Sequence, residues 1–553
     1  MRWGRKFPQR RIGAKLTAAT FCVSFASLRL CGKTVLVERV VVLLENTALI
    51  IHGHFYQPPR ENPWTGRVER EVSAAPYHDW NERIHAECYA ANAAALVGEH
   101  TVNNYAHISF NFGPTLLSWL ETHHPDTYLR ILEADKASAR ARSGHGNALA
   151  QAYGHAILPL CNEHDRVTQV MWGIADFRHR FGREPESMWL PETAVNDATL
   201  EVLIDHGLRY VILAPAQASR YRAPGSADWQ DVEDSSIDPS CPYSYFHRDG
   251  SGRSIAVFFY DGPLARAIAF EKALTSSERL VGMLKSASAG KSMVNIATDG
   301  ETYGHHFKFG DLCLAHVLSV EAPREGFWIT NYGEFLDRYP PQHEVKIKSG
   351  PDNEGTSWSC EHGVSRWLRN CGCHTGGESN WNQEWRGPLR SALNYLRDRA
   401  AEGFEELGSK LFKDPWDARN AYIDVLLKRC SPAEFLARHA RYPLSPADEL
   451  RAFTLLEMQR NALLMFTSCG WFFYDISGIE TIQVMKYAAR VIEHSDQLGL
   501  PSNRNTFVAM LAEARSNVAE KGTGADIYVL HAEPSSPWPT SSGQRSDNSC
   551  LPA

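Results

Sequence analysis

The first 350 residues alternate short apolar runs with longer segments in which apolar residues follow the helical period. Each apolar run ends in a polar residue, glycine or proline and predicts a buried strand. These strands are expected at residues 43–55, 105–112, 148–160, 188–191, 210–214, 255–260 and 293–298. Helices are expected between them at residues 81–98, 114–133, 163–181, 197–206 and 276–289.

Strands that alternate with helices are joined by crossovers and therefore lie parallel in one sheet. An alternation that continues for roughly 250 residues favours a barrel, and the main rival is an open doubly wound sheet. The chain shows no GxGxxG fingerprint that would indicate a dinucleotide site in such an open sheet. The sequence therefore predicts an α/β fold with a barrel.

The pattern of apolar residues changes near residue 380, after which the helical period dominates. This period predicts helices at residues 389–402, 415–427, 432–441, 446–467 and 480–498. The expected domains are a leader or disordered extension (1–45), a catalytic barrel (46–345), a helical C-terminal domain (346–525) and a disordered tail (526–553). The tail is predicted from its Ser- and Pro-rich composition.

The composition of the chain excludes some classes of function. Apolar residues make up 43% of the 553 residues, which allows a large core, and the net charge of -7 argues against a nucleic-acid partner. The first 15 residues are basic and the next 16 fairly apolar, as in a signal peptide, but Arg29 and Lys33 interrupt the pattern. A disordered leader or a mistranslated extension fits equally well. No later run is long and apolar enough to predict a membrane helix.

Twelve cysteines are scattered along the chain, which suits a reducing cytoplasm better than a disulfide framework. One group stands closer together: Cys360, Cys371, Cys373 and His374. Three thiols and an imidazole can bind zinc, but the spacing lacks a CxxC pair. Free thiols are therefore expected here, and no metal or other cofactor is assigned.

Glu192 and Asp299 each directly follow a predicted strand, where chemistry gathers in strand-and-helix folds. Two carboxyl groups are the minimum equipment for cleaving a glycosidic bond. Taken singly, Glu192 could begin a helix and Asp299 could lie in a turn. Glu301 lies two residues beyond Asp299 and would share its face if the strand continued. Trp358 lies in a Gly- and Ser-rich loop, which makes its ring a candidate for stacking on a sugar.

Four segments together resemble the motifs of glycoside hydrolase family 57, in that family's order. They are His52-Gly53-His54-Phe55-Tyr56-Gln57-Pro58, Gly154-His155-Ala156-Ile157-Leu158-Pro159-Leu160, Met188-Trp189-Leu190-Pro191-Glu192 with the residues from Phe181 onward, and Asp299-Gly300-Glu301-Thr302-Tyr303-Gly304-His305-His306. The first departs from the family pattern by two residues inserted before Gln57. The resemblance covers roughly residues 48–340.

The resemblance implies a (β/α)7-type incomplete barrel followed by an α-helical C-terminal domain, which also looks like an uncharacterised domain. It implies a retaining hydrolase or transglycosylase that acts on α-glucans. Glu192 would be the nucleophile and Asp299 the general acid and then base. His52, His54, His155, His305 and Glu301 would contact the sugar, without a metal or organic cofactor.

Two other functions remain open at this point. In a metal-dependent carbohydrate deacetylase or mannosidase-like enzyme, His52, His54 and Asp299 would be the ligands. In a non-catalytic glucan-binding protein, the pocket would bind without turnover. The sequence does not decide between hydrolysis and transfer, nor does it indicate the glucan's length and linkage or the oligomeric state.

Overall fold

The computed structural model describes residues 24–30, 33–39 and 46–534. The chain divides into two compact units, residues 1–46 and 47–553. In the first unit, β1 (Ser24–Leu30) and β2 (Lys33–Arg39) form an antiparallel hairpin. The rest of the predicted leader, and the predicted tail beyond residue 534, lie outside the described residues.

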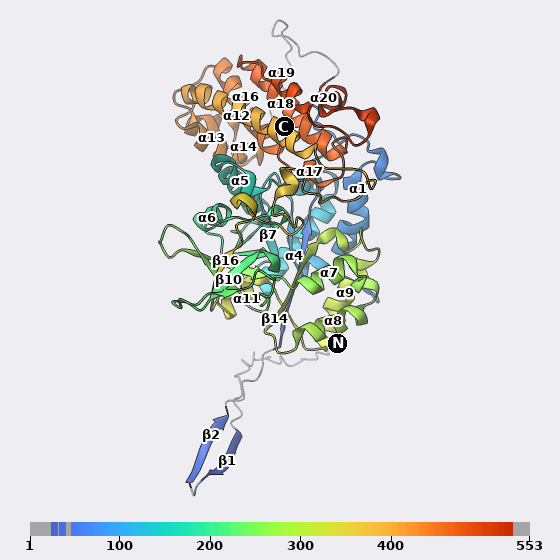
Figure 1. The fold of residues 1–553 in the computed structure, drawn as a ribbon, viewed down its shortest axis with the longest axis vertical. Coiled ribbons are helices and arrows are strands. Elements are labelled where there is room, and N and C mark those ends of the chain that lie inside the picture. The colour runs from blue at the N-terminus through green and yellow to red at the C-terminus, as the bar shows by residue number, and fades with distance from the viewer. Residues whose placement is uncertain (1–23, 31–32, 40–45, 535–553) are drawn as a thin grey trace, which may run out of the picture. The chain divides into compact units, whose positions relative to one another are not determined.

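The second unit contains a curled sheet of parallel strands (Figure 1). Its strands are β3 (Ala48–Phe55), β6 (Ser109–Phe112), β7 (Ala148–Gln151), β8 (Met188–Trp189), β9 (Tyr210–Leu213), β13 (Ser254–Phe259) and β14 (Met293–Asp299). Parallel ladders run in the order β14-β3-β6-β7-β8, a bridge between Ser187 and Tyr210 leads to β9, and β9 pairs with β13. The predicted α/β fold with an incomplete barrel is confirmed.

The barrel is incomplete because β13 and β14 are not joined by a ladder. The Asp261 N–H donates to the carbonyl of Asn295 over 2.8 Å, and the Asn295 side chain donates to the carbonyl of Phe259 over 3.1 Å. On its outer side, β13 pairs with an extension made of β12 (Tyr243–Phe246), β16 (Glu344–Ile347), β10 (Ala218–Arg222) and β11 (Gln230–Asp231). β15 (Trp328–Ile329) pairs with the first residues of β3.

Helices cover both faces of the parallel strands and shield them from solvent. All eight residues of β3 are buried, as expected for a strand with helices on both sides. The helices of this region are α1 (Trp80–Ile84), α2 (Ala90–Ala93), α3 (Pro114–His123), α4 (Pro125–Ala141), α5 (Glu163–Phe181), α6 (Asp197–Asp205), α7 (Gly262–Phe270), α8 (Ser277–Ser288), α9 (Gly310–His316), α10 (Ala322–Arg324) and α11 (Tyr332–Arg338). A short hairpin, β4 (Ala95–Val97) with β5 (His100–Val102), follows α2.

Several predicted elements differ from the structure. The helix predicted at 81–98 ends at Ala93 and is followed by β4, and the helix predicted at 415–427 is divided into Pro415–Ala421 and Ile423–Leu426. The helix predicted at 114–133 is two helices, α3 and α4, because the backbone leaves the helical region at His124 and Pro125 starts anew. The strand predicted at 148–160 ends at Gln151, and His155 beyond it has a φ of 53°. A left-handed residue cannot continue a strand. The apolar residues around it are buried because they face the helical region.

The C-terminal region is helical (orange to red in Figure 1) and has its own core. Its helices are α12 (Arg386–Leu411), α13 (Pro415–Ala421), α14 (Ile423–Leu426), α15 (Pro432–His439), α16 (Pro446–Leu464), α17 (Cys469–Phe472), α18 (Ile479–Gln497), α19 (Arg504–Leu511) and α20 (Gly524–Ile527). Residues 528–532 add a further helical turn, so the first part of the predicted disordered tail is ordered. Among the described residues, no helix is both long and apolar enough to cross a bilayer.

Helix α5 joins the barrel to the helical region. Trp172 on α5 is buried in the C-terminal core, and its indole N–H donates to the carbonyl of Asn420 over 3.0 Å. Next to it, the Arg419 guanidinium forms a 2.8 Å ion pair with Asp165 near the start of α5. Only 1% of the Arg419 side chain and 9% of the Asp165 side chain are exposed. Neither charge can turn to water if its partner is lost.

We therefore expect Arg419→Met to lower the free energy of unfolding by about 3–5 kcal/mol, because Asp165 would stay charged and buried without its partner. The matched control is Arg429→Met, which removes the partner of Asp424 from a pair whose side chains are 40% and 29% exposed. That control should cost less than about 1 kcal/mol. Denaturant titration followed by circular dichroism measures both; equal losses would contradict the role given to Arg419.

Candidate active site

The carboxyl ends of the parallel strands collect the polar residues that the sequence singled out. In the ladder, Asp299 of β14 lies opposite His54 of β3, and His54 lies opposite Asn111 of β6. Glu192 follows β8, at the other end of this five-stranded run. Strands four positions apart in a flat sheet are about 19 Å apart. The sheet is curled (Figure 1), and the charge of Glu192 contributes to the raised pKa of Asp299, so the two carboxyl groups interact electrostatically.

Glu192 is held in a strained turn. Its backbone is left-handed, with φ 59° and ψ 22°, and Thr193 after it also has a positive φ. The Trp358 indole N–H and the Ser359 hydroxyl donate to Oε2 of Glu192 over 3.1 and 2.7 Å. The Trp358 backbone N–H donates to the Glu192 carbonyl over 3.1 Å. The loop that carries Trp358 therefore fixes both the backbone and the carboxylate of Glu192.

The two hydrogen bonds to Glu192 also tune its ionisation. Burial raises the pKa of Glu192 above the usual carboxyl range, and the bonds from Ser359 and Trp358 and the charge of Arg366 oppose that rise. Hydrogen bonds to a carboxylate favour its charged form. These donors thus support an ionised Glu192 in a place where burial alone would favour a neutral one.

The surroundings of Asp299 favour the protonated form of its carboxyl group. Water reaches its side chain, yet protein surrounds the carboxyl group closely enough that desolvation is the main cause of a strongly raised pKa. The charges of Glu301 and Glu192 raise the pKa further. Of the two carboxyl groups, Asp299 therefore keeps its proton more readily, and the surroundings of the pair provide one acid and one base.

Glu301 does not share a face with Asp299 along a strand, because β14 ends at Asp299 and Gly300–Thr302 form a 3-10 turn. Its Oε1 accepts hydrogen bonds from the Tyr56 backbone N–H over 3.0 Å and the Tyr89 hydroxyl over 2.7 Å. Burial raises the pKa of Glu301 to about 7. Glu301 is thus a fixed carboxyl group that acts on Asp299 through its charge.

Three predicted sugar-binding histidines belong to one hydrogen-bonded chain. His52 lies 3.0 Å from the Ser109 hydroxyl and 3.1 Å from Asn111 Oδ1. The Asn111 amide N–H donates to Nδ1 of His54 over 2.9 Å, and the Nε2 atoms of His54 and His155 lie 3.2 Å apart. One assignment of protons satisfies each of these hydrogen bonds in turn and leaves each ring neutral.

Neutral rings agree with the burial of these residues. Desolvation lowers the pKa of His52 and His54 to about 3 and holds that of His155 well below its usual value. Trp189 stacks on both strand histidines, with ring centroids 4.6 Å from His52 and 5.1 Å from His54. A buried indole therefore packs against both histidine rings.

The helical region supplies one end of this chain. The Nδ1 atom of His155 lies 2.7 Å from the hydroxyl of Ser468, which precedes α17. On its face, His155 stacks against Tyr56 with centroids 3.6 Å apart, and the Tyr56 hydroxyl is buried without a hydrogen-bond partner among the described residues. Sequence reasoning missed Tyr56, Asn111, Ser359 and Ser468. Tyr56 lies inside the first motif and Asn111 at the end of a predicted strand, but no sequence signal connects Ser468 with His155.

Two further predicted site residues lie in different surroundings. Trp358 has its ring near Trp189 and Tyr260, besides its bond to Glu192. His305 forms an ion pair with Glu87 and places its ring against Trp80, so sugar binding by His305 stays a prediction. In the part of the chain that is described, His52, His54 and Asp299 do not form a group whose donor atoms could reach one ion. The arrangement expected for a metal-dependent deacetylase is therefore not found among these residues.

Comparison with known proteins gives two family matches. The model of glycosyl hydrolase family 57 matches residues 48–348, and a domain of unknown function (DUF3536) matches residues 381–539. Alpha-amylase 1 of Dictyoglomus thermophilum is 25% identical over 199 residues, which are 36% of this chain and 26% of that protein. An alpha-amylase of Pyrococcus horikoshii is 22% identical over 258 residues, 46% of this chain and 37% of that protein. The chain thus matches only a minor part of the length of either relative.

Solved structures share the fold at low identity. An exo-type maltose-forming amylase from Pyrococcus sp. ST04 superposes with a TM-score of 0.61 at 16% identity, covering 84% of this chain and 82% of that one. A branching enzyme of the same family type from Pyrococcus horikoshii gives 0.51 at 16% identity, covering 82% and 89%. These similarities concern the fold.

The neutral histidine chain makes stability sensitive to acid. The folded-state pKa values lie below the unfolded value of about 6.5, so the unfolded chain binds more protons below that pH. Their contribution is complete above about pH 6.5 and declines toward pH 3, by about 1.4 kcal/mol per pH unit for each histidine. We expect His155→Gln to flatten this decline by one histidine's share in denaturant titrations at pH 7 and 5. An unchanged slope would contradict a buried neutral His155.

Proposed function

The chain belongs to glycosyl hydrolase family 57, whose model matches more than half of it, and we propose that it is a retaining glycoside hydrolase or transglycosylase acting on α-glucans. The family resemblance of the sequence motifs is thereby confirmed. The relatives named as amylases and a branching enzyme support an α-glucan as the substrate. The observation that carries the proposal is the pairing of Glu192 with Asp299, in which the surroundings favour a charged and a protonated carboxyl group.

In the first step, the Glu192 carboxylate attacks the anomeric carbon and forms a glycosyl ester, while Asp299 donates its proton to the departing glycosidic oxygen. In the second step, Asp299, now ionised, takes a proton from an acceptor hydroxyl. That acceptor attacks the anomeric carbon and releases Glu192 as a carboxylate. Water as acceptor gives hydrolysis, and a sugar hydroxyl gives transfer.

The geometry of Glu192 supports its role as the nucleophile. Both side-chain donors bind Oε2, so among the described residues Oε1 has no hydrogen-bond partner and is available to attack. The strained backbone and the loop contacts fix this oxygen before substrate arrives, which lowers the reorganisation that the reaction needs. His52, His54 and His155 use both of their ring nitrogens in the hydrogen-bonded chain, so their contact with sugar hydroxyl groups stays a prediction.

We expect Glu192→Gln and Asp299→Asn each to lower turnover by several orders of magnitude with the fold unchanged. The assay is incubation with a panel of α-glucans of different length and linkage, with products separated by size and linkage. Glu184→Gln is the matched control, because Glu184 belongs to the same segment but its side chain is 70% exposed and pairs with Arg178. Near-normal turnover in either active-site variant on every accepted substrate would sink the assigned role.

Activity should show a bell-shaped pH profile, limited at low pH by protonation of Glu192 and at high pH by ionisation of Asp299. The negative charge of Glu301 raises the pKa of Asp299, so Glu301→Gln should move the alkaline limb to lower pH. Glutamine can keep both hydrogen bonds, because Tyr56 and Tyr89 donate to the same oxygen.

Glu87→Gln serves as the control for this shift. Glu87 pairs with His305 and is not among the groups that act on the pKa of Asp299. The pH dependence of kcat/KM for the two variants and the unaltered protein measures the effect. An alkaline limb that stays in place in Glu301→Gln, or moves equally in Glu87→Gln, would show that Glu301 does not control Asp299.

A further inference from the structure

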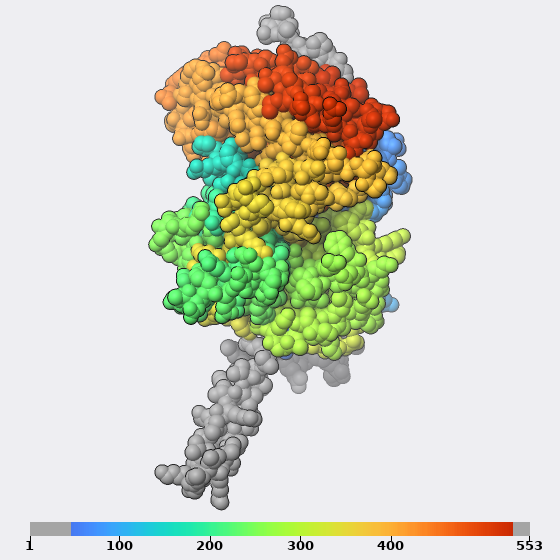
Figure 2. Space-filling view, viewed as in Figure 1, coloured from blue at the N-terminus to red at the C-terminus, as the bar shows by residue number. Residues whose placement is uncertain are grey.

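The segment between β16 and α12 passes next to Glu192 and contains little regular structure, only two short 3-10 turns over residues 348–385. In the space-filling view, yellow to light-orange residues spread between the green barrel surface and the orange-to-red helices (Figure 2). An irregular segment of this length is uncommon in a compact domain unless something fixes it. Its order therefore needs an explanation.

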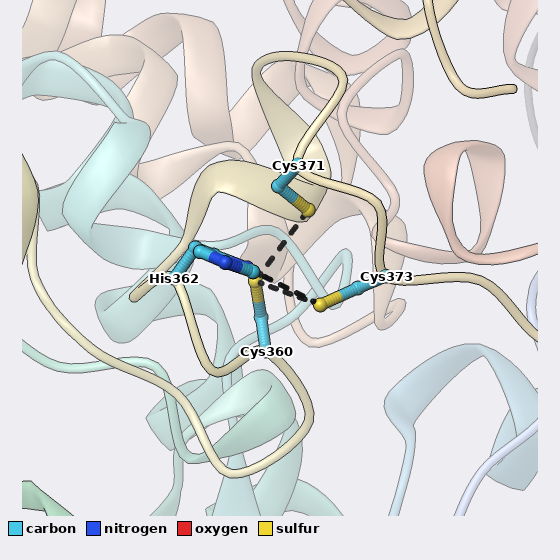
Figure 3. Close-up of side chains that lie close together, drawn as sticks. All are labelled: Cys360, His362, Cys371 and Cys373. Carbon is cyan, nitrogen blue, oxygen red and sulfur yellow. Dashed lines mark hydrogen bonds between the residues drawn. The ribbon is translucent and has the colours of Figure 1, made fainter.

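Four side chains of this segment converge on one point (Figure 3): Cys360, His362, Cys371 and Cys373. One donor atom from each lies within 4.8 Å of all the others. We propose that these four residues bind a structural Zn²⁺ ion. Three thiolates and one imidazole form a donor set that zinc binds in closed tetrahedral sites.

The spacing of the donor atoms agrees with a single tetrahedral ion. The Cys360 sulfur lies 3.8 Å from that of Cys371 and 3.9 Å from that of Cys373, and the Cys373 sulfur lies 3.6 Å from Nδ1 of His362. With zinc–sulfur bonds of about 2.3 Å and zinc–nitrogen bonds of about 2.05 Å, tetrahedral geometry requires edges of about 3.8 and 3.6 Å. A [4Fe–4S] cluster binds each thiolate through a different iron and would hold the sulfurs further apart.

The charges around the cluster support thiolates rather than thiols. Arg386 is fully buried, and its guanidinium donates to the carbonyl of Cys373 over 2.7 Å. Arg366 is also buried and donates to the carbonyl of Ser359 over 2.8 Å. In the described part of the chain, neither forms an ion pair with a carboxylate. A Zn²⁺ ion with three thiolates carries one net negative charge, which would balance a buried guanidinium.

The ligand set differs from the four residues that sequence spacing grouped together. His374 is exposed, and its Nδ1 contacts the carbonyl of Gly376 instead of the cluster. His362 takes its place because the turn after Cys360 folds its ring back toward Cys373. The ligands form two pairs with one residue between them, Cys360 with His362 and Cys371 with Cys373, which the usual CxxC pattern does not reveal.

The ion would fix the loop that holds Glu192. Trp358 and Ser359, which donate to the Glu192 carboxylate, directly precede Cys360. Closing the segment through four ligands removes much of its conformational freedom in the absence of substrate. This consequence for catalysis rests on the proposed function, whereas metal binding itself does not.

The test begins with the metal content of the full-length protein, purified under reducing conditions from cells supplied with zinc and analysed by mass spectrometry of its elements. We expect about one zinc ion per chain, and loss of most of it in Cys371→Ser and Cys373→Ser. The matched controls are His374→Ala and Cys430→Ser, which change a neighbouring histidine and a distant thiol and should keep the metal. Absence of stoichiometric zinc, or zinc retained in both ligand variants, would overturn the proposal.

A second measurement does not depend on the folding of variants. The unaltered protein, freed of zinc by a chelator, is titrated with Co²⁺, and thiolate-to-cobalt charge-transfer bands together with intense visible bands are expected. Cobalt bound without thiolate bands would place the metal elsewhere and refute the site. Hydrogen exchange of residues 356–368 should slow when zinc is restored, and unchanged exchange would refute the role in fixing the loop. Both readouts remain decisive even if no α-glucan is turned over.

Discussion

The pair of hydrogen bonds that Trp358 and Ser359 donate to Glu192 is the interaction on which the site depends. It joins the end of β8 to a segment more than 160 residues away, and it counteracts the burial that would otherwise neutralise Glu192. Across the curled sheet, Asp299 has no such donors among the described residues, and the charges of Glu301 and Glu192 act on it. The difference in chemistry between the two carboxyl groups thus comes from their hydrogen-bond partners and from the charges beside them.

The helical region is part of the site as well as a neighbour of the barrel. Its core includes Trp172 and Ala194 of the barrel, and Ser468 completes the hydrogen-bonded chain that runs through His155 to the strand histidines. Such a chain holds the rings in one orientation only if both of its ends are anchored. The barrel anchors one end at Ser109, and the helical region anchors the other. We infer that the region matched as a domain of unknown function shapes the substrate site by contact.

The loop between the two regions carries the strongest constraints on Glu192 but has almost no secondary structure to hold it. Arg386 is buried at the end of this loop and donates to the carbonyl of Cys373, and thiolates in the cysteine cluster would place negative charge near it. A zinc ion would keep the thiolates ionised and would hold the loop in one conformation.

The sequence by itself determined the parallel barrel, the helical C-terminal region and the positions of Glu192, Asp299 and the strand histidines. Period and strand-end chemistry are local properties, and all seven predicted strands are present, although some of their limits moved. Tertiary structure decided what the sequence could not. Some features depend on how a turn folds back: the left-handed turn at His155, the turn that separates Glu301 from Asp299, and the choice of His362 over His374. Others depend on residues far apart in the chain, namely the hydrogen bonds made by Ser359 and Ser468. Spacing along the chain carries no information about such contacts, because they arise only when the sheet curls and the helical region packs against it.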